Sequence, residues 1–159
     1  MRATKQKVIR ERHDSAVRNI NICQIESFLG NQLGRKFCDG TNGDCGPVIY
    51  SFYKEKPIDP HRRGSPTPDI AVIYIDKGWR LAFIEVKRTV SFVTSDTLAG
   101  QEQTSLELIQ NRGHMEMFIE SLGDRRITLA NANQMFDAGI NYYTAHVSAN
   151  GNLKPIYHL

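Results

Sequence analysis

The chain has no long hydrophobic run, and this absence limits where the protein can reside. None of its apolar stretches approaches about 20 residues, the length that a membrane-spanning helix needs. The first residues, Met-Arg-Ala-Thr-Lys-Gln-Lys, hold no apolar core of the kind found in a signal peptide. We therefore expect a cytoplasmic protein without a membrane partner.

Cysteine is also scarce. The chain has three cysteines, Cys23, Cys38 and Cys45, and none of them forms a Cys-x-x-Cys pair. This odd number and wide spacing argue against a disulfide framework and against a zinc site built from paired ligands. We expect the fold to be held by an apolar core.

The excess of charge of one sign is small, since 20 Lys and Arg residues stand against 17 Asp and Glu residues, for a net charge of +3. That balance does not by itself identify a nucleic-acid-binding protein. The distribution is more informative, because basic residues cluster near the N-terminus and on either side of the motif described below. Those that could contact phosphates are Lys5, Lys7, Arg10, Arg12, Arg62, Arg63 and Arg88. Such clusters are equally compatible with a solvated surface.

The composition that remains is that of an ordinary globular protein. The chain has 159 residues, of which 40% are hydrophobic and 23% charged. No internal repeat or low-complexity tract interrupts it. We expect one α/β domain over residues 1–159.

Two short apolar runs, Ile70 to Ile75 and Leu81 to Ile84, are the most informative part of the chain. They are rich in β-branched and aromatic residues, which is typical of strands buried on both faces. Asp76-Lys77-Gly78 separates them, and glycine readily takes the positive φ that a tight turn needs. The pattern predicts an antiparallel hairpin.

This hairpin would bring together two acids, because Asp69 precedes its first strand and Glu85 ends its second. Side chains alternate along a strand, so Glu85 and Lys87 share a face while Val86 points into the core. Two carboxylates beside an ammonium suit a divalent cation and a phosphodiester. The alternative is a surface ion pair of Glu85 with Lys87 or Arg88, contributing about 0–1 kcal/mol.

Pro68-Asp69, fifteen residues and then Glu85-Val86-Lys87 resemble the motif of the PD-(D/E)XK nuclease superfamily. The resemblance extends over roughly residues 15–130, although its specific part is the motif. It implies a restriction-endonuclease-like αβββαβ core, in which a central mixed sheet is flanked by helices.

The remaining elements follow from periodicity and turn residues. An extra C-terminal β-hairpin is indicated by Asn150-Gly151. The expected elements are a helix over 5–33, a strand over 47–53, a helix over 101–122 closed by Gly123, a fourth core strand over 126–130, a short helix over 131–138, and hairpin strands over 141–148 and 152–158.

Two further positions are candidates for the site. Glu26 falls within the apolar stripe of the first helix (Ile22, Ile25, Leu29 and Leu33), where an acid needs a partner. The resemblance implies an accessory metal ligand there, while the alternative is a stripe-edge acid paired with Arg18. The resemblance also implies a glutamine after Lys87. Its position matches Gln103, whereas helical angle favours Gln101.

The function that the resemblance implies is metal-dependent endonuclease activity on DNA, of the restriction, resolvase, phage-repair or toxin type. Asp69, Glu85 and the Val86 carbonyl would hold one or two Mg²⁺ or Mn²⁺ ions, with Lys87 assisting hydrolysis. Two alternatives stay open: an RNA-cleaving endonuclease, which His13 on the first helix invites, and a catalytically silent nucleic-acid-binding module. Expected partners are DNA in preference to RNA, a second copy in a homodimer, and an immunity or inhibitor protein if the chain is a toxin domain.

Overall fold

The structure is a computed structural model that describes residues 15–38, 46–87, 103–148 and 152–155. Its centre is a mixed sheet of five strands, which confirms the α/β class. In spatial order the strands are β1 (Val48–Lys54), β2 (Ile70–Ile75), β3 (Trp79–Lys87), β4 (Asn141–Val147) and β5 (Leu153–Pro155). Neighbouring strands are antiparallel except β3 and β4, which are parallel.

The β2–β3 hairpin forms as predicted. Its turn places Lys77 at φ 54° and Gly78 at φ 126°, and the Asp76 amide donates to the Gly78 carbonyl oxygen at 2.9 Å. The register pairs Ile70 with Ile84, which sets Asp69 level with Glu85 at the end of the hairpin away from the turn. The strand predicted over 47–53 is also confirmed, as β1.

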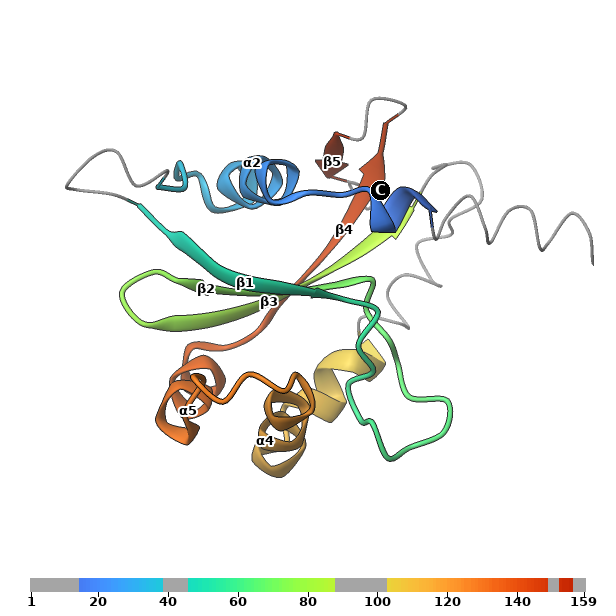
Figure 1. Cartoon of the computed structure of the whole chain (residues 1–159), viewed down its shortest axis with the longest axis vertical. Helices are drawn as coiled ribbons and strands as arrows, with labels where there is room; N and C mark the ends of the chain where they lie inside the picture. Colours follow the sequence, from blue (N-terminus) through green and yellow to red (C-terminus); the bar gives the residue numbers. More distant parts are fainter. Residues whose placement is uncertain (1–14, 39–45, 88–102, 149–151, 156–159) are drawn as a thin grey trace, which may run out of the picture.

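Helices cover both faces of the sheet. Figure 1 shows α2 (Ile22–Leu33) on one side, and α4 (Arg112–Ser121) with α5 (Leu129–Ala138) on the other. Residues 103–109 are helical and lie on the α4–α5 side. The fold therefore has three layers, with one sheet shared by two cores.

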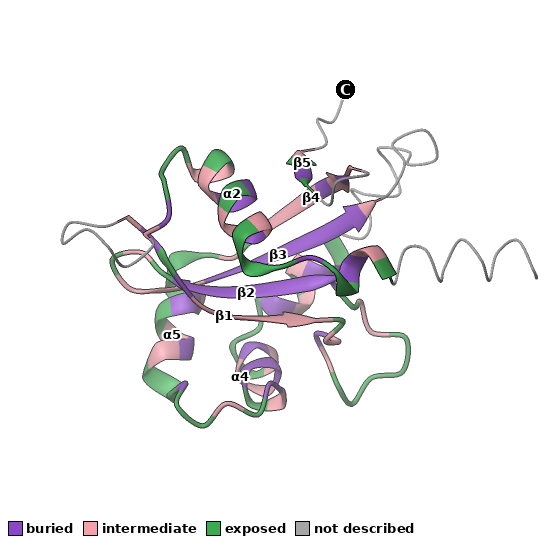
Figure 2. Cartoon of the chain, turned by 45° about the horizontal axis from the view of Figure 1, so that its top comes forward, coloured by how far each residue is buried: buried purple, intermediate pink, exposed green. Residues whose placement is uncertain are grey.

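Strand alternation divides the two cores. Ala82, Ile84 and Val86 of β3 face α2, in a core that includes Phe28. Leu81 and Phe83 face the other way, in a core with the apolar side chains of α4 and α5. Because both faces are covered, most residues along β2 and β3 are buried, as the colouring in Figure 2 shows.

Two long helices predicted as continuous are interrupted. In place of one helix over 5–33, residues 15–18 are helical and α2 begins after Asn21, whose side chain accepts from the Gln24 amide at 3.1 Å. Residues 5–14 lie outside the described residues. In place of one helix over 101–122, the helical residues 103–109 are followed by a new start at α4, capped by Asn111. In both places an asparagine side chain accepts from a helix amide, which favours the start of a new helix over continuation of the previous one.

Gly123 follows α4 at φ 76°, the conformation expected for a helix-ending glycine.

The predicted strand over 126–130 is wrong. Thr128 caps α5 there, its side chain accepting from the Asn131 amide at 3.1 Å while Asn131 accepts from the Thr128 amide at 2.9 Å. This reciprocal capping box starts a helix at Leu129. The predicted short helix over 131–138 belongs to α5, and Gly139 follows it.

The strand that joins the core beyond β3 is instead β4, in the segment assigned above to an added hairpin. β4 and β5 do pair as antiparallel strands, which confirms the hairpin, but β4 also pairs with β3 from Asn141 to His146. Asn150 and Gly151 lie outside the described residues.

Cys38 is disulfide-bonded, although the number and spacing of the cysteines argued against a disulfide framework. Cys23 is an exposed free thiol, so the partner of Cys38 lies outside the described residues. No helix in the described ranges has the length and apolarity that crossing a membrane requires.

Candidate active site

Asp69 and Glu85 lie together at the end of the β2–β3 hairpin away from its turn, as the hairpin geometry predicts. Only 6% of Asp69 and 8% of Glu85 is exposed. The two carboxyl groups are close enough to hydrogen-bond with each other, which requires a proton on one of them. Their convergence was the central expectation from the motif, and the structure bears it out.

The backbone holds Asp69 in place. The Val86 amide donates to Asp69 Oδ2 at 2.7 Å, and the Glu55 amide donates to the Asp69 carbonyl oxygen at 3.0 Å. Asp69 is therefore tied to β3 through its side chain and to the end of β1 through its backbone. Val86 itself points into the α2-side core, as strand alternation predicts.

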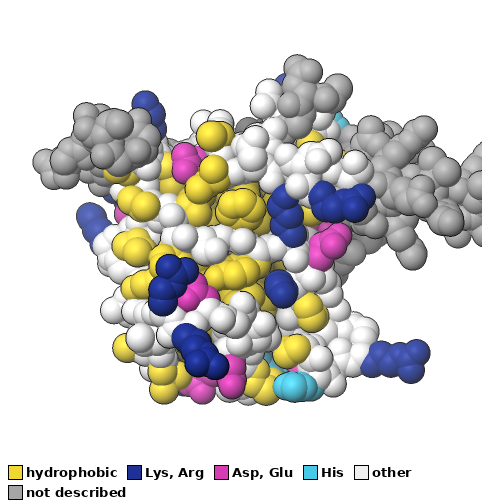
Figure 3. Space-filling model, viewed as in Figure 1, with side chains coloured by type: hydrophobic (Ala, Val, Ile, Leu, Met, Phe, Trp, Pro, Cys, Tyr) yellow, Lys and Arg dark blue, Asp and Glu magenta, His cyan; other side chains and the backbone are white. Residues whose placement is uncertain are grey.

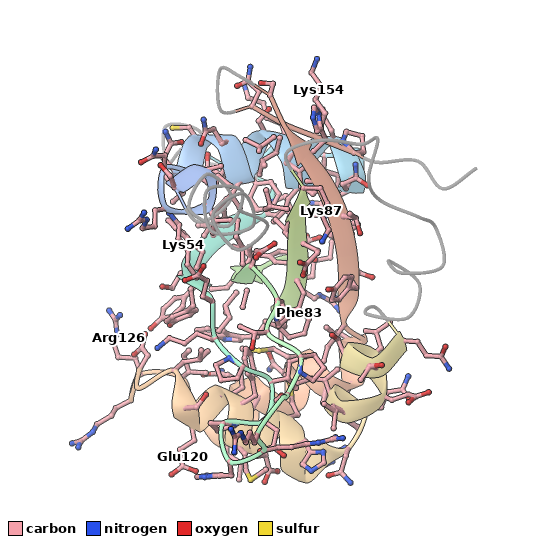
Figure 4. The ribbon with its side chains drawn as sticks, turned by 90° about the vertical axis from the view of Figure 1, so that its right-hand side faces the viewer. Lys54, Phe83, Lys87, Glu120, Arg126 and Lys154 are labelled. Carbon is pink, nitrogen blue, oxygen red and sulfur yellow. The ribbon has the colours of Figure 1, made fainter. Side chains whose placement is uncertain are left out.

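Lys87 lies on the same face as Glu85. Its Nζ is 3.8 Å from Glu85 Oε1, and 24% of its side chain is exposed, against 11% for that of Glu85. Figure 4 shows Lys87 farther along β3 than Phe83, toward the end of the sheet where β1 places Lys54. The ammonium group thus stands between a buried carboxylate pair and solvent.

The electrostatics of the pair are unfavourable when both acids are ionised. Burial, followed by the neighbouring Asp69 carboxylate, raises the pKa of Glu85 to about 8. Lys87 and a hydrogen bond from Tyr142 act in the opposite direction and offset only part of this rise. The folded site therefore favours a bound proton or cation over two ionised carboxylates.

Tyr142 and Ser105 complete this arrangement, and the motif gave no indication of either. Tyr142 Oη donates to Glu85 Oε2 at 3.0 Å, and Ser105 hydrogen-bonds to Tyr142 from the helical residues 103–109. One signal in the sequence could have indicated that Tyr142 lies beside β3. Two parallel strands need a connection of a dozen or more residues, and the helices between β3 and residues 141–148 provide such a connection. The same pairing sets His146 level with Lys87 and Thr144 level with Glu85.

Glu26 does not join the carboxylate pair, which corrects its assignment as an accessory metal ligand. The stripe that α2 buries consists of Ile25, Phe28 and Leu29, whereas Ile22 is 42% exposed. This stripe packs on the sheet face opposite to Glu85.

The position of Glu26 along the sheet is also unsuitable. Glu26 is half-buried and lines a surface pocket with Lys36 and Phe37. The backbone amide of Cys38, the residue after Phe37, donates a hydrogen bond to the carbonyl oxygen of Pro47, just before β1 begins. This pocket therefore lies near the start of β1. Val48 there pairs with Ile75, at the far end of β2 from Asp69.

The two glutamines do not strengthen the site. Gln103 is exposed, and its amide nitrogen donates to Glu107 Oε1 at 3.0 Å, one turn along the same helix. Gln101 lies outside the described residues. Ser105, two positions after Gln103, hydrogen-bonds to Tyr142 and is 1% exposed.

The structure locates only part of the predicted basic surface. Arg62 and Arg63 are exposed on the loop that leads into Asp69. On the face shown in Figure 3, Lys and Arg side chains are dispersed, and acidic side chains lie beside several of them. The other basic candidates, Lys5, Lys7, Arg10, Arg12 and Arg88, lie outside the described residues, as does His13.

Comparison with known proteins finds no matching family model, no matching curated protein and no matching solved structure.

Proposed function

We propose that this chain is a metal-dependent endonuclease that hydrolyses phosphodiester bonds in DNA. The observation that carries the proposal is the meeting of Asp69 and Glu85 beside Lys87 at one end of a buried hairpin. The pKa of Glu85 is raised to about 8, and strongly perturbed acids are common at functional sites, because catalysis requires side chains with tuned pKa values.

The donor chemistry of the pair fits a hard divalent cation. Carboxylate oxygens are the ligands that Mg²⁺ and Mn²⁺ prefer, and Mg²⁺ retains several waters, so few protein ligands suffice. A cation would also relieve the repulsion from Asp69, which adds to the effect of burial in raising the pKa of Glu85. Within the described residues no cluster of three or more His, Cys, Asp and Glu side chains could hold a metal. The site that we propose uses two carboxylates, those of Asp69 and Glu85, together with the Val86 carbonyl. When bound, the ion would acidify a water and polarise the phosphate.

Lys87 would stabilise charge during the reaction. Hydrolysis places additional negative charge on the oxygens around phosphorus, and a pre-positioned ammonium favours that state over the ground state. The contact with Glu85 Oε1 restrains the lysine, while its partial exposure lets a substrate phosphate approach. Electrostatic assistance is the role that we assign to Lys87.

The order of elements supports the same proposal. A helix, three antiparallel strands, intervening helices and a strand parallel to the third follow one another along the described chain. This order agrees with the αβββαβ core that the PD-(D/E)XK resemblance implies, with Asp69 before the second strand and Glu85 in the third.

The test is a cleavage assay with matched variants. Purified protein is incubated with supercoiled plasmid, four-way-junction DNA and structured RNA, each with Mg²⁺, Mn²⁺ or EDTA. We expect metal-dependent cutting of DNA and a rate loss of about 100-fold or more in Glu85→Gln and Lys87→Ala. Glu120→Gln and Lys154→Ala alter exposed residues elsewhere and should retain full activity.

The outcomes separate the alternatives. Cutting of RNA alone would replace the proposal with the RNA-cleaving endonuclease, and binding without cutting under any metal would favour the silent module. Cutting that survives in Glu85→Gln would rule out this site.

A further inference from the structure

Each carboxylate of the pair is held by a different kind of donor. Asp69 Oδ2 accepts from a backbone amide, that of Val86, at 2.7 Å. Glu85 Oε2 accepts from a side chain, the hydroxyl of Tyr142, at 3.0 Å. A substitution at Val86 therefore keeps the amide that donates to Asp69, whereas a substitution at Tyr142 can remove the hydroxyl that donates to Glu85.

The Tyr142 hydroxyl is itself held on its other side. Ser105 hydrogen-bonds to it, and Ser105 is a polar residue with only 1% of its surface exposed. A buried hydroxyl is costly unless it is bonded, so this serine is part of an ordered network. Ser105, Tyr142 and Glu85 come from the helical residues 103–109, β4 and β3, and only the tertiary fold assembles them.

Packing restricts the ring as well as the hydroxyl. The Tyr142 ring lies 6.3 Å from the Phe83 ring, and Tyr142 is level with Phe83 in the β3–β4 register. The hydroxyl of Tyr142 donates to Glu85 Oε2 at 3.0 Å, so the packing of the ring and this hydrogen bond together restrict where the Glu85 carboxylate lies.

We propose that Tyr142 is a positioning residue, which orients the Glu85 carboxylate for a divalent cation and is itself held by Ser105. Tyr142 holds Oε2, and the other oxygen, Oε1, is the one on the side of Lys87. This inference rests on the proposed function, because it assumes that Glu85 is a metal ligand. Residues that orient metal ligands commonly change metal affinity or activity 10- to 100-fold when they are replaced.

The experiment measures Mn²⁺ binding by isothermal titration calorimetry, followed by DNA cleavage with kcat and KM determined separately. Tyr142→Phe keeps the ring and removes only the hydroxyl. We expect its Mn²⁺ affinity to fall about 10-fold and its kcat to fall with KM for DNA nearly unchanged. Ser105→Ala should show a smaller loss, and Tyr142→Phe combined with Ser105→Ala should match Tyr142→Phe alone.

Tyr143→Phe is the matched control. It is the same substitution one position along β4, where the ring faces α2 and packs edge-on against Phe28 at 6.0 Å. It should leave Mn²⁺ affinity unchanged, so a general loosening of β4 would be recognised by equal losses in both tyrosine variants, and that result would overturn the proposal. If Tyr142→Phe does not fold, unchanged Mn²⁺ affinity in Ser105→Ala would also overturn it.

The failure of this inference differs from the failure of the proposed function. Wild-type Mn²⁺ binding that Glu85→Gln abolishes and Tyr142→Phe leaves intact would overturn only the role of Tyr142. A wild-type chain that binds no Mn²⁺ would overturn the metal site and the positioning role together.

Discussion

At the scale of single residues, the main electrostatic feature of the described chain is the buried pair of carboxyl groups on Asp69 and Glu85. Asp69 and Glu85 are both almost fully buried and close enough to share a proton. Lys87 Nζ lies 3.8 Å from Glu85 Oε1 and offsets only part of the cost. Without a cation the pair should therefore make stability depend on pH.

We expect metal-free wild-type protein to lose stability as the pH rises from about 5 to about 8. The pKa of Glu85 is raised from 4.5 to about 8 in the folded chain, so between these values only the folded chain retains this proton. Stability then falls with increasing pH, because the folded state binds more protons than the unfolded state. The loss is at most about 5 kcal/mol, at about 1.4 kcal/mol per unit of pKa shift.

Urea denaturation in EDTA at several pH values checks this expectation. Glu85→Gln cannot lose the proton, so its stability relative to wild type should increase steadily across the same range. Glu120→Gln, on the exposed side of α4, should follow the wild-type curve. A constant difference between Glu85→Gln and wild type at every pH would contradict the raised pKa.

At the scale of elements, local hydrogen bonds decide where helices begin. Residues 126–130 have the apolar character of a strand, yet Thr128 and Asn131 satisfy each other's amides and start α5. The capping hydroxyl is therefore the feature that distinguishes the two outcomes at this position.

Thr128→Ala should destabilise the protein by about 1 kcal/mol, because it removes the acceptor for the Asn131 amide. Thr128→Ser retains the hydroxyl and should cost much less. Chemical denaturation of both variants measures the difference. Thr67→Ala, at an exposed threonine in the loop before β2, is the control for loss of a threonine that caps no helix. Equal losses in the alanine and serine variants would show that the cap does not stabilise α5.

At the scale of the whole molecule, one sheet joins the two cores. Phe28 of α2 is 1% exposed in one core, and Phe118 of α4 is 0% exposed in the other. β2 and β3 contribute alternate side chains to both, so neither core can be disrupted without affecting the strands that support the other. We expect the chain to unfold as one cooperative unit.

Trp79 allows this cooperativity to be measured, because it is the only tryptophan in the chain and packs against the α4–α5 core. Phe28→Leu, on the other side of the sheet, should lower stability by about 1 kcal/mol. The midpoints from Trp79 fluorescence and from far-ultraviolet circular dichroism should coincide and shift together. A Trp79 midpoint that stays at the wild-type value while the dichroism midpoint falls would show two independent cores.

The hairpin and the meeting of Asp69, Glu85 and Lys87 were predictable because they depend on nearby residues. The Asp76-Lys77-Gly78 turn brings the two strands together, and side-chain alternation then sets Glu85 and Lys87 on one face. Both rules act over fewer than about twenty residues, and over so short a range the local sequence is enough to predict the arrangement.

Long-range packing decided the rest. The parallel pairing of β4 with β3 brought Tyr142 to Glu85, and the seating of α2 on the opposite face kept Glu26 away from it. These placements depend on how whole elements bury their apolar faces, and local patterns do not specify which elements become neighbours. The acidic pair was therefore readable in the chain, whereas the residues that surround it were determined only by the folded molecule.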